Sequence, residues 1–146
     1  MLVQLLPDQI SRYWQQFREA IKLGMQPITD EELKETLDSV LKGRLTAWVS
    51  GNESGMNGFV LTCIGHDDIV NKKSFIIYFA HRFGEATKGD WFHGINTLKR
   101  AAQRLGCYRV VAYTESQEVV QLCQAIGGRL KEFVLEFPIE EMKYEN

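Results

Sequence analysis

The sequence predicts an α+β (α/β) fold, a mixed but mainly antiparallel sheet flanked by helices, in the order β-α-α-β-β-β-α-β-α-β. Three observations carry this prediction. Two segments with helical periodicity stand near the N-terminus, three strand-length apolar segments with polar turns follow them, and the last third alternates strand and helix patterns. Because a helix between two strands is typical of a parallel crossover, the sheet should be mixed.

The first predicted elements are a short strand and two helices. Leu2 to Leu6 favours a strand, and Pro7 suits the first turn of a helix because its missing N–H is not needed there. A capping box of Thr29 and Glu32 opens the second helix. Both helices carry an apolar face that we expect to pack on the sheet: Ile10, Tyr13, Trp14, Phe17, Ile21, Leu33, Leu37, Val40 and Leu41.

Three antiparallel strands are predicted next, at Leu45 to Val49, Phe59 to Ile64 and Phe75 to Ala80, because polar, glycine-bearing turns separate these apolar segments. A long amphipathic helix follows from Trp91 and ends at Gly106.

The C-terminal third is predicted to hold a strand at Tyr108 to Tyr113, a helix at Ser116 to Ile126 and a final strand at Leu130 to Phe137. Residues 139–146 form a polar tail. Since the sequence shows no internal repeat and no linker, residues 1–146 are expected to form a single domain.

The composition indicates which partners and which cellular compartment are expected. With 17 basic and 19 acidic side chains there is no global field to attract nucleic acid, so none is expected as a partner. Cys63, Cys107 and Cys123 show no paired metal-ligand spacing and are expected to be buried free thiols, which suits a reducing compartment. No apolar run reaches the ~20 residues that span a bilayer, and no secretory signal is evident, so a cytoplasmic location and no membrane partner are expected.

The segment between the third antiparallel strand and the long helix is the candidate ligand site. Gly84 and Gly89 interrupt the apolar run that ends at Phe83, and the helix starts directly afterwards. The first amides of a helix lack intrahelical partners and lie at the positive end of its dipole, so this terminus suits a phosphate-bearing ligand.

The element order resembles that of the GCN5-related N-acetyltransferase (GNAT) superfamily over nearly the whole chain. In that family a Gln/Arg-x-x-Gly-x-Gly/Ala loop binds the pyrophosphate of acetyl-CoA. Counting back from Gly106 places the six motif positions on Ala86 to Trp91, of which Gly89 matches. Ala86 replaces the Gln or Arg, and Trp91 replaces the small last residue.

The resemblance implies an acetyl-CoA site along the end of the central strand and the start of the long helix. The residues it assigns to cofactor binding are Phe79, Ala80, His81, Arg82, Lys88, Gly89, Asp90 and Trp91. The later segment from Ser116 to Gly127 resembles a family segment whose tyrosine protonates the leaving thiolate in many members, and Cys123 stands at the tyrosine position. Since Cys123 shares an apolar face with Val119 and Ile126, a packing role is expected.

Trp91, the pair Gly106 and Cys107, and the divergent loop also resemble small acetyltransferase-like proteins encoded by bacteriophages. This resemblance implies a location in the host cytoplasm or in the virion.

The sequence leaves the catalytic residues unknown. His81, Glu85 and Glu115 are the candidate bases, but an ordinary strand-end or loop role is the simpler interpretation of each, and none is assigned as catalytic. His93 has a position from which it can touch an anion, but a plain surface role is the simpler interpretation. A final cluster, His66, Asp67 and Asp68, lacks a distant partner, so no metal is predicted.

Two functions remain open on the sequence. The first is an acetyl-CoA-dependent N-acetyltransferase with a small-molecule or protein amine as acceptor, and the element order favours it. The second is a catalytically inactive GNAT-like fold that acts as a binding or structural module with a protein partner, and Ala86 and Trp91 favour it, because Trp91 would plug the phosphate loop. Exposed strand edges allow a homodimer, although no feature demands one.

Overall fold

The computed structural model describes residues 1–52, 55–82, 87–140 and 143–144. The chain divides into two compact units, residues 1–115 and residues 116–146, and each is described by itself. The single domain expected over residues 1–146 stays a prediction. Among the described residues, no helix combines the length and apolarity that a membrane crossing needs.

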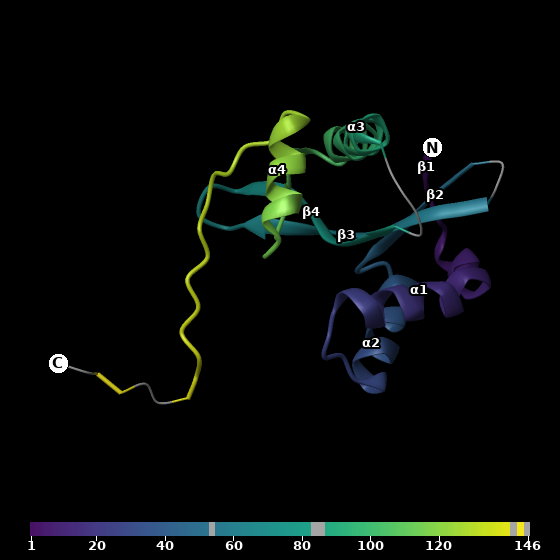
Figure 1. Cartoon of the computed structure of the whole chain (residues 1–146), viewed down its shortest axis with the longest axis horizontal. Coiled ribbons are helices and arrows are strands. Elements are labelled where there is room, and N and C mark those ends of the chain that lie inside the picture. Colours follow the sequence, from purple (N-terminus) through teal and green to yellow (C-terminus); the bar gives the residue numbers. More distant parts are fainter. Residues whose placement is uncertain (53–54, 83–86, 141–142, 145–146) are drawn as a thin grey trace. The chain divides into compact units, whose positions relative to one another are not determined.

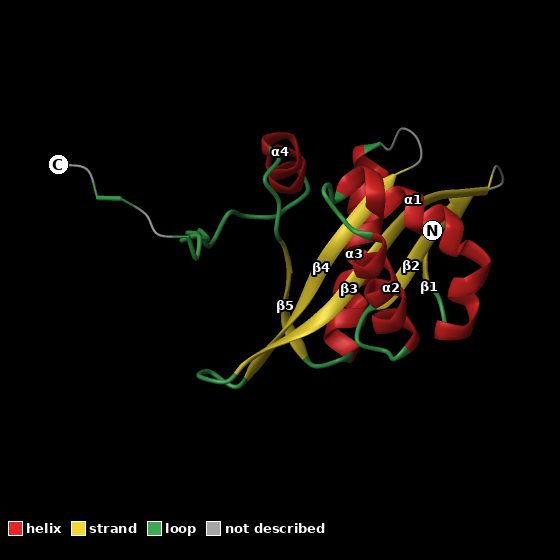
Figure 2. Cartoon of the chain, turned by 90° about the horizontal axis from the view of Figure 1, so that it is seen from below, coloured by secondary structure: helices red, strands yellow, loops and turns green. Residues whose placement is uncertain are grey.

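Unit 1 is built on a five-stranded sheet in the order β1-β2-β3-β4-β5. The strands are β1 (Leu2–Gln4), β2 (Thr46–Asn52), β3 (Gly55–Asp67), β4 (Lys72–Arg82) and β5 (Cys107–Ala112). β1 to β4 pair antiparallel, and β5 pairs parallel to β4, as Figure 2 shows. A parallel neighbour requires a crossover, which the helix α3 supplies. The mixed, mainly antiparallel sheet predicted from the sequence is therefore confirmed.

Two helices cover one face of the sheet. The 3₁₀ turn η1 (Pro7–Gln9) leads into α1 (Ile10–Gly24), and α2 (Asp30–Leu41) follows. The predicted capping box opens α2, since the Thr29 side chain accepts from the amide of Glu32 while the Glu32 carboxylate accepts from the amide of Thr29. Phe17 of α1 is fully buried and stacks on Phe59 of β3 with ring centroids 4.0 Å apart. Figure 1 shows both helices on the side of the sheet opposite α3.

The third helix, α3 (Lys88–Arg104), packs on the other face through Leu98, Ala101 and Ala102, which contact Trp48 and Phe75 of the sheet. It begins three residues before the start predicted at Trp91. The cause is a second capping box, in which the Thr87 side chain accepts from the amide of Asp90 and the Asp90 carboxylate accepts from the amide of Thr87. Lys88, Gly89 and Asp90 thus belong to the first helical turn.

A β-bulge at Tyr78 interrupts β4. Ile77 pairs with Thr62 of β3 and Phe79 pairs with Leu61, so the intervening Tyr78 has no partner of its own. Since side chains alternate between the two faces of a sheet, one extra residue places every side chain beyond it on the opposite face. Ile77 accordingly packs in the cluster under α3, while Phe79 packs in the cluster under α1 and α2.

Unit 2 holds one helix, α4 (Gln117–Ala125), capped by the Ser116 side chain, which accepts from the amide of Val119. The final strand predicted at Leu130 to Phe137 is not formed, because residues 128–138 carry no helix or strand. A strand exists only where a neighbour completes its hydrogen bonds, and no described strand pairs with this segment. The alternating sequence pattern alone therefore did not produce the element.

Candidate functional site

The end of β4 beyond the bulge presents backbone groups that none of the strands described in the structure uses. β5 pairs with β4 only from Lys73 to Ile77, whereas β4 continues to Arg82. On its other side β4 stays paired with β3 to the end. The two parallel strands therefore separate at the bulge, and the N–H and C=O groups that face β5 are available to an extended ligand.

Phe79, Ala80, His81 and Arg82, the four predicted site residues on β4, lie along this separated stretch. The ring of Phe79 is buried, Ala80 is exposed, and His81 and Arg82 are half-buried. His81 lies on the face covered by α1 and α2, because its ring stacks parallel to that of Phe79 at 6.3 Å. Partial burial lowers the pKa of His81 below its ordinary value of 6.5, so the imidazole is predominantly neutral at neutral pH.

The other four predicted site residues, Lys88, Gly89, Asp90 and Trp91, form the first turn of α3. Within the described chain, no hydrogen bond uses the amide N–H groups of Lys88 and Gly89, which leaves both donors available to an anion. The motif position Ala86 and the candidate base Glu85 lie outside the described residues.

Asp90 places a negative charge at the same terminus. The Asp90 pKa lies below its ordinary value, first because the carboxylate accepts a hydrogen bond from the Thr87 amide and a second one from the Thr87 side chain, and then because the guanidinium of Arg82 is nearby. The carboxylate is therefore ionised at neutral pH and opposes a phosphate at this end of α3.

Arg82 links the end of β4 to the first turn of α3. Its guanidinium carbon lies 5.8 Å from the centroid of the Trp91 ring, within cation–π range. Trp91 itself is half-buried rather than fully packed in the core, although the sequence period placed it on the inward face. The positive charge of Arg82 also partly offsets the negative charge of Asp90.

A groove between α2 and the sheet adjoins the bulge. Its volume is ≈ 370 Å³, and Tyr78 and Cys63 form its sheet side. The helix side carries two carboxylates, Glu32 and Glu35, and two hydroxyls, Thr36 and Ser39. Burial raises the pKa of the Cys63 thiol, so this side chain stays uncharged. Sequence analysis missed the groove, since α2 was recognised only by its apolar face.

The remaining sequence candidates do not join this site. His66 bonds Asp68 at 2.9 Å and Asn71 at 3.2 Å within the turn between β3 and β4. Asp67 accepts from the amides that follow it in the same turn, and no cluster among the described residues offers three side chains for a metal ion. His93 is exposed on α3.

Glu115 and Cys123 lie further along the chain. Glu115 is exposed at the end of unit 1, whereas Cys123 belongs to α4 of unit 2, where burial raises the pKa of its thiol.

Comparison with known proteins gives matches among solved structures. No protein-family model and no curated protein matches the chain. An aminoglycoside N-acetyltransferase, AAC(6')-Iy, in complex with CoA superposes with a TM-score of 0.76 at 15% identity, covering 96% of this chain and 94% of that one. An aminoglycoside acetyltransferase from an uncultured soil metagenomic sample, in complex with sisomicin, gives 0.75 at 13% identity over 97% and 96%. A predicted acetyltransferase with acetyl-CoA from Clostridium acetobutylicum gives 0.71 at 14% identity over 95% and 96%.

These likenesses extend over almost the full length of each partner, while the identities are low. They show a shared fold: the chain has the fold of the GCN5-related N-acetyltransferases, as its element order predicted.

Proposed function

We propose that the chain is an acetyl-CoA-dependent N-acetyltransferase that acts on a small-molecule amine. The observation that carries the proposal is the bulge at Tyr78 with the separation of β4 from β5 directly beyond it. A regular sheet would have paired these backbone groups, so the interruption makes room for an extended ligand between two parallel strands. The shared fold supports this interpretation, and the complexes of similar proteins with CoA and acetyl-CoA indicate the ligand.

The residues present fit such a cofactor. The backbone of β4 from Phe79 to Arg82 would hold the pantetheine arm as a strand neighbour holds a strand. Arg82, Lys88 and the available amides of Lys88 and Gly89 would hold the phosphates at the start of α3. When bound, acetyl-CoA supplies the thioester whose acetyl group moves to the amine.

The groove beside the bulge would bind the acceptor. Glu32 and Glu35 favour a cationic amine, and the hydroxyls of Thr36 and Ser39 suit a ligand with hydrogen-bonding groups. The similar protein in complex with sisomicin indicates the same class of acceptor. His81 lies on the same face of the sheet, and its lowered pKa keeps the imidazole neutral and able to accept the proton that the attacking amine releases.

Calorimetric titration of acetyl-CoA into the full chain tests cofactor binding, with two arginine variants as a matched pair. Arg82→Ala removes the cation at the site, and Arg104→Ala removes one at the other end of α3. We expect the natural chain to bind acetyl-CoA with micromolar affinity. Arg82→Ala should weaken this affinity about tenfold, because it removes one charge-assisted hydrogen bond, and Arg104→Ala should leave the affinity unchanged. Equal effects of both variants, or no binding at all, would exclude the proposed phosphate site.

Turnover tests the acceptor. Release of free CoA thiol is measured with sisomicin, with simple diamines and with simple monoamines, for the natural chain and for Glu35→Gln. We expect the glutamine variant to raise KM for dicationic amines more than for monoamines, because it removes a charge without changing shape. Equal KM changes for both classes would exclude Glu35 as the cation partner.

One observation favours a second function, a GNAT-like fold that binds a protein partner without catalysis. The Asp90 carboxylate occupies the start of α3 that the phosphates would need, and Trp91 stands beside it. Titration of Trp91→Gly and Asp90→Asn decides between the two functions. If acetyl-CoA binds only to these variants, the natural chain is a non-catalytic module; if the natural chain binds it equally well, Trp91 is no plug. The phage origin and virion location stay predictions.

A further inference from the structure

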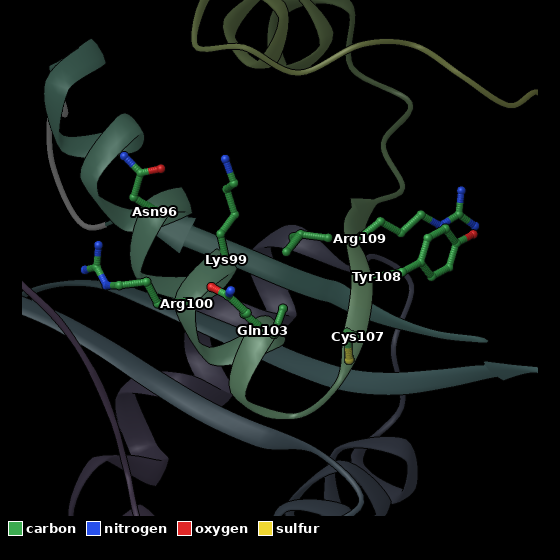
Figure 3. A pocket seen from close by; sticks show the side chains of 9 residues that line it. Asn96, Lys99, Arg100, Gln103, Cys107, Tyr108 and Arg109 are labelled. Carbon is green, nitrogen blue, oxygen red and sulfur yellow. The ribbon is translucent and has the colours of Figure 1, made fainter.

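The groove beside the bulge carries charges of both signs. Glu32 and Glu35 line it from α2, and Arg44 lines it from just beyond the end of that helix. A second groove, of ≈ 390 Å³ between α3 and β5, differs in this respect, because the charged side chains that line it are all cations, as Figure 3 shows: Lys99, Arg100 and Arg109. The groove beside the bulge therefore suits a ligand that itself has both signs of charge.

The two signs are separated along α2. Glu35 and Ser39 lie about one helical turn apart, which is about 6 Å along the helix axis. Arg44 is attached at the Ser39 end of the groove, because its backbone amide donates to the Ser39 carbonyl at 2.8 Å. A ligand that reaches from Glu35 to Arg44 therefore needs its cationic and anionic groups about 6 Å or somewhat more apart.

Glu35 is the carboxylate that an ammonium group can pair with. None of the ion pairs among the described residues uses its side chain. The Glu32 carboxylate, by contrast, accepts from the Thr29 amide in the capping box at the start of α2. An ammonium group in the groove meets little competition from the protein's own cations at Glu35.

Arg44 brings an excess of positive charge to the other end of the groove. A single oxygen of Asp38, Oδ2, contacts Lys42 at 2.9 Å and Arg44 at 3.2 Å. One carboxylate shared by two cations leaves this cluster with one net positive charge. The contact with Asp38 uses the Nη2 atom of Arg44, whereas a guanidinium has five N–H donors in a geometry that matches a carboxylate. The Arg44 side chain is 63% exposed, so a ligand can reach its other donors.

We propose that the acceptor is a zwitterion, an amine with a carboxylate at its far end, and that Arg44 determines this specificity. The inference rests on the proposed function, since it names the class of acceptor. Glu35 pairs with the ammonium group, Arg44 holds the carboxylate, and the side chains of Tyr78 and Leu45 contact the methylene groups between them. In 6-aminohexanoate, six bonds of about 1.5 Å separate the nitrogen from the carboxylate carbon and span roughly 7 Å, which fits the groove.

Ligand-observed NMR titration of the full chain with 6-aminohexanoate and with hexylamine tests the inference. The two probes share the amine and the length of the carbon chain and differ in the carboxylate. We expect the natural chain to bind 6-aminohexanoate about fivefold more tightly than hexylamine, as one ion pair at an exposed arginine allows. Arg44→Gln should abolish this preference, because it removes the cation and keeps a polar side chain.

Arg100→Gln is the matched control, because it removes a cation from the groove between α3 and β5, and it should keep the preference. Equal affinities of the natural chain for the two probes, or a preference that survives in Arg44→Gln, would overturn the inference.

Turnover separates this inference from the proposed function. If the natural chain prefers 6-aminohexanoate in the titration but releases no CoA thiol with either probe, the proposed function is contradicted while the anion site at Arg44 stands. If the chain acetylates both probes with the same KM, the proposed function stands and the specificity assigned to Arg44 is wrong.

Discussion

Deleting Tyr78 is expected to keep the fold and to abolish acetyl-CoA binding. Because Ile77 pairs with Thr62 and Phe79 pairs with Leu61, removing the residue between them leaves every other pair of β3 and β4 in register. The bulge would disappear, and β4 would continue as a regular strand. Pairing of β5 ends at Ile77, so the deletion does not disturb it.

The loss in the free energy of unfolding on deletion of Tyr78 shows whether this residue is a bulge residue or an ordinary strand residue. Tyr78 is 52% exposed, so its ring buries about 100 Å², and its loss costs at most about 2.5 kcal/mol. If Tyr78 held a regular position, its deletion would turn Phe79 to the wrong face. Phe79 is only 9% exposed and lies 5.7 Å from Phe59, so its misplacement would add about 3–5 kcal/mol. The combined loss would approach the whole stability of a domain.

Urea unfolding followed by circular dichroism measures the cost, and calorimetric titration with acetyl-CoA measures binding. Tyr78→Ala is the matched control, because it removes the ring and keeps the bulge. We expect the two variants to unfold at similar urea concentrations, while only the deletion loses binding. An unfolded deletion variant would refute the register assigned to β4, and a deletion variant that binds as well as Tyr78→Ala would refute the role of the bulge.

Three further outcomes are expected from urea unfolding. Gly94→Ala should stabilise α3 by about 0.5–1 kcal/mol, because open space surrounds the added methyl, whereas Gly106→Ala should destabilise the chain by about 1 kcal/mol or more, because its φ is +75°; a stabilised Gly106→Ala would contradict the left-handed turn there. Thr87→Ala should cost about 1 kcal/mol by removing the cap of α3, and an unchanged midpoint would exclude the capping box. Since burial lowers the pKa of His81, the unfolded state binds its proton more readily, so stability is fully present above pH 6.5 and declines as the pH falls through the folded pKa. His81→Gln should reduce the difference between midpoints at pH 7.5 and pH 5.5, and an unchanged difference would show that another group causes it.

Much of the fold was predictable because it rests on local patterns. The box of Thr29 and Glu32 marks the start of α2 in the sequence as clearly as in the structure. The second box, Thr87 with Asp90, has the same spacing, but Asp rather than Glu or Gln stands at its last position. The start of the helix was therefore predicted too late in the sequence. Counting Asp90 as a cap would have found it.

The candidate site was predictable only in part. The resemblance placed Phe79 to Arg82 at a strand end and Lys88 to Trp91 at a helix start, and the structure has them there, while their role in cofactor binding stays a prediction. It gave no indication that Asp90 caps its own helix, because that depends on the conformation of Thr87. The groove with Glu32 and Glu35 also escaped prediction, since it arises where α2 meets a sheet that is distant in sequence.

The sequence by itself determined the element order and the helix faces, because periodicity and capping act over a few neighbouring residues. It also determined the alternating pattern of residues 130–137, from which a strand was predicted. Tertiary structure alone decided that Tyr78 bulges and that β4 and β5 separate, since both depend on which distant residues complete the backbone hydrogen bonds. For the same reason it decided that residues 130–137 form no strand with any strand that the structure describes: alternation can specify a face, but only a neighbouring edge makes a strand.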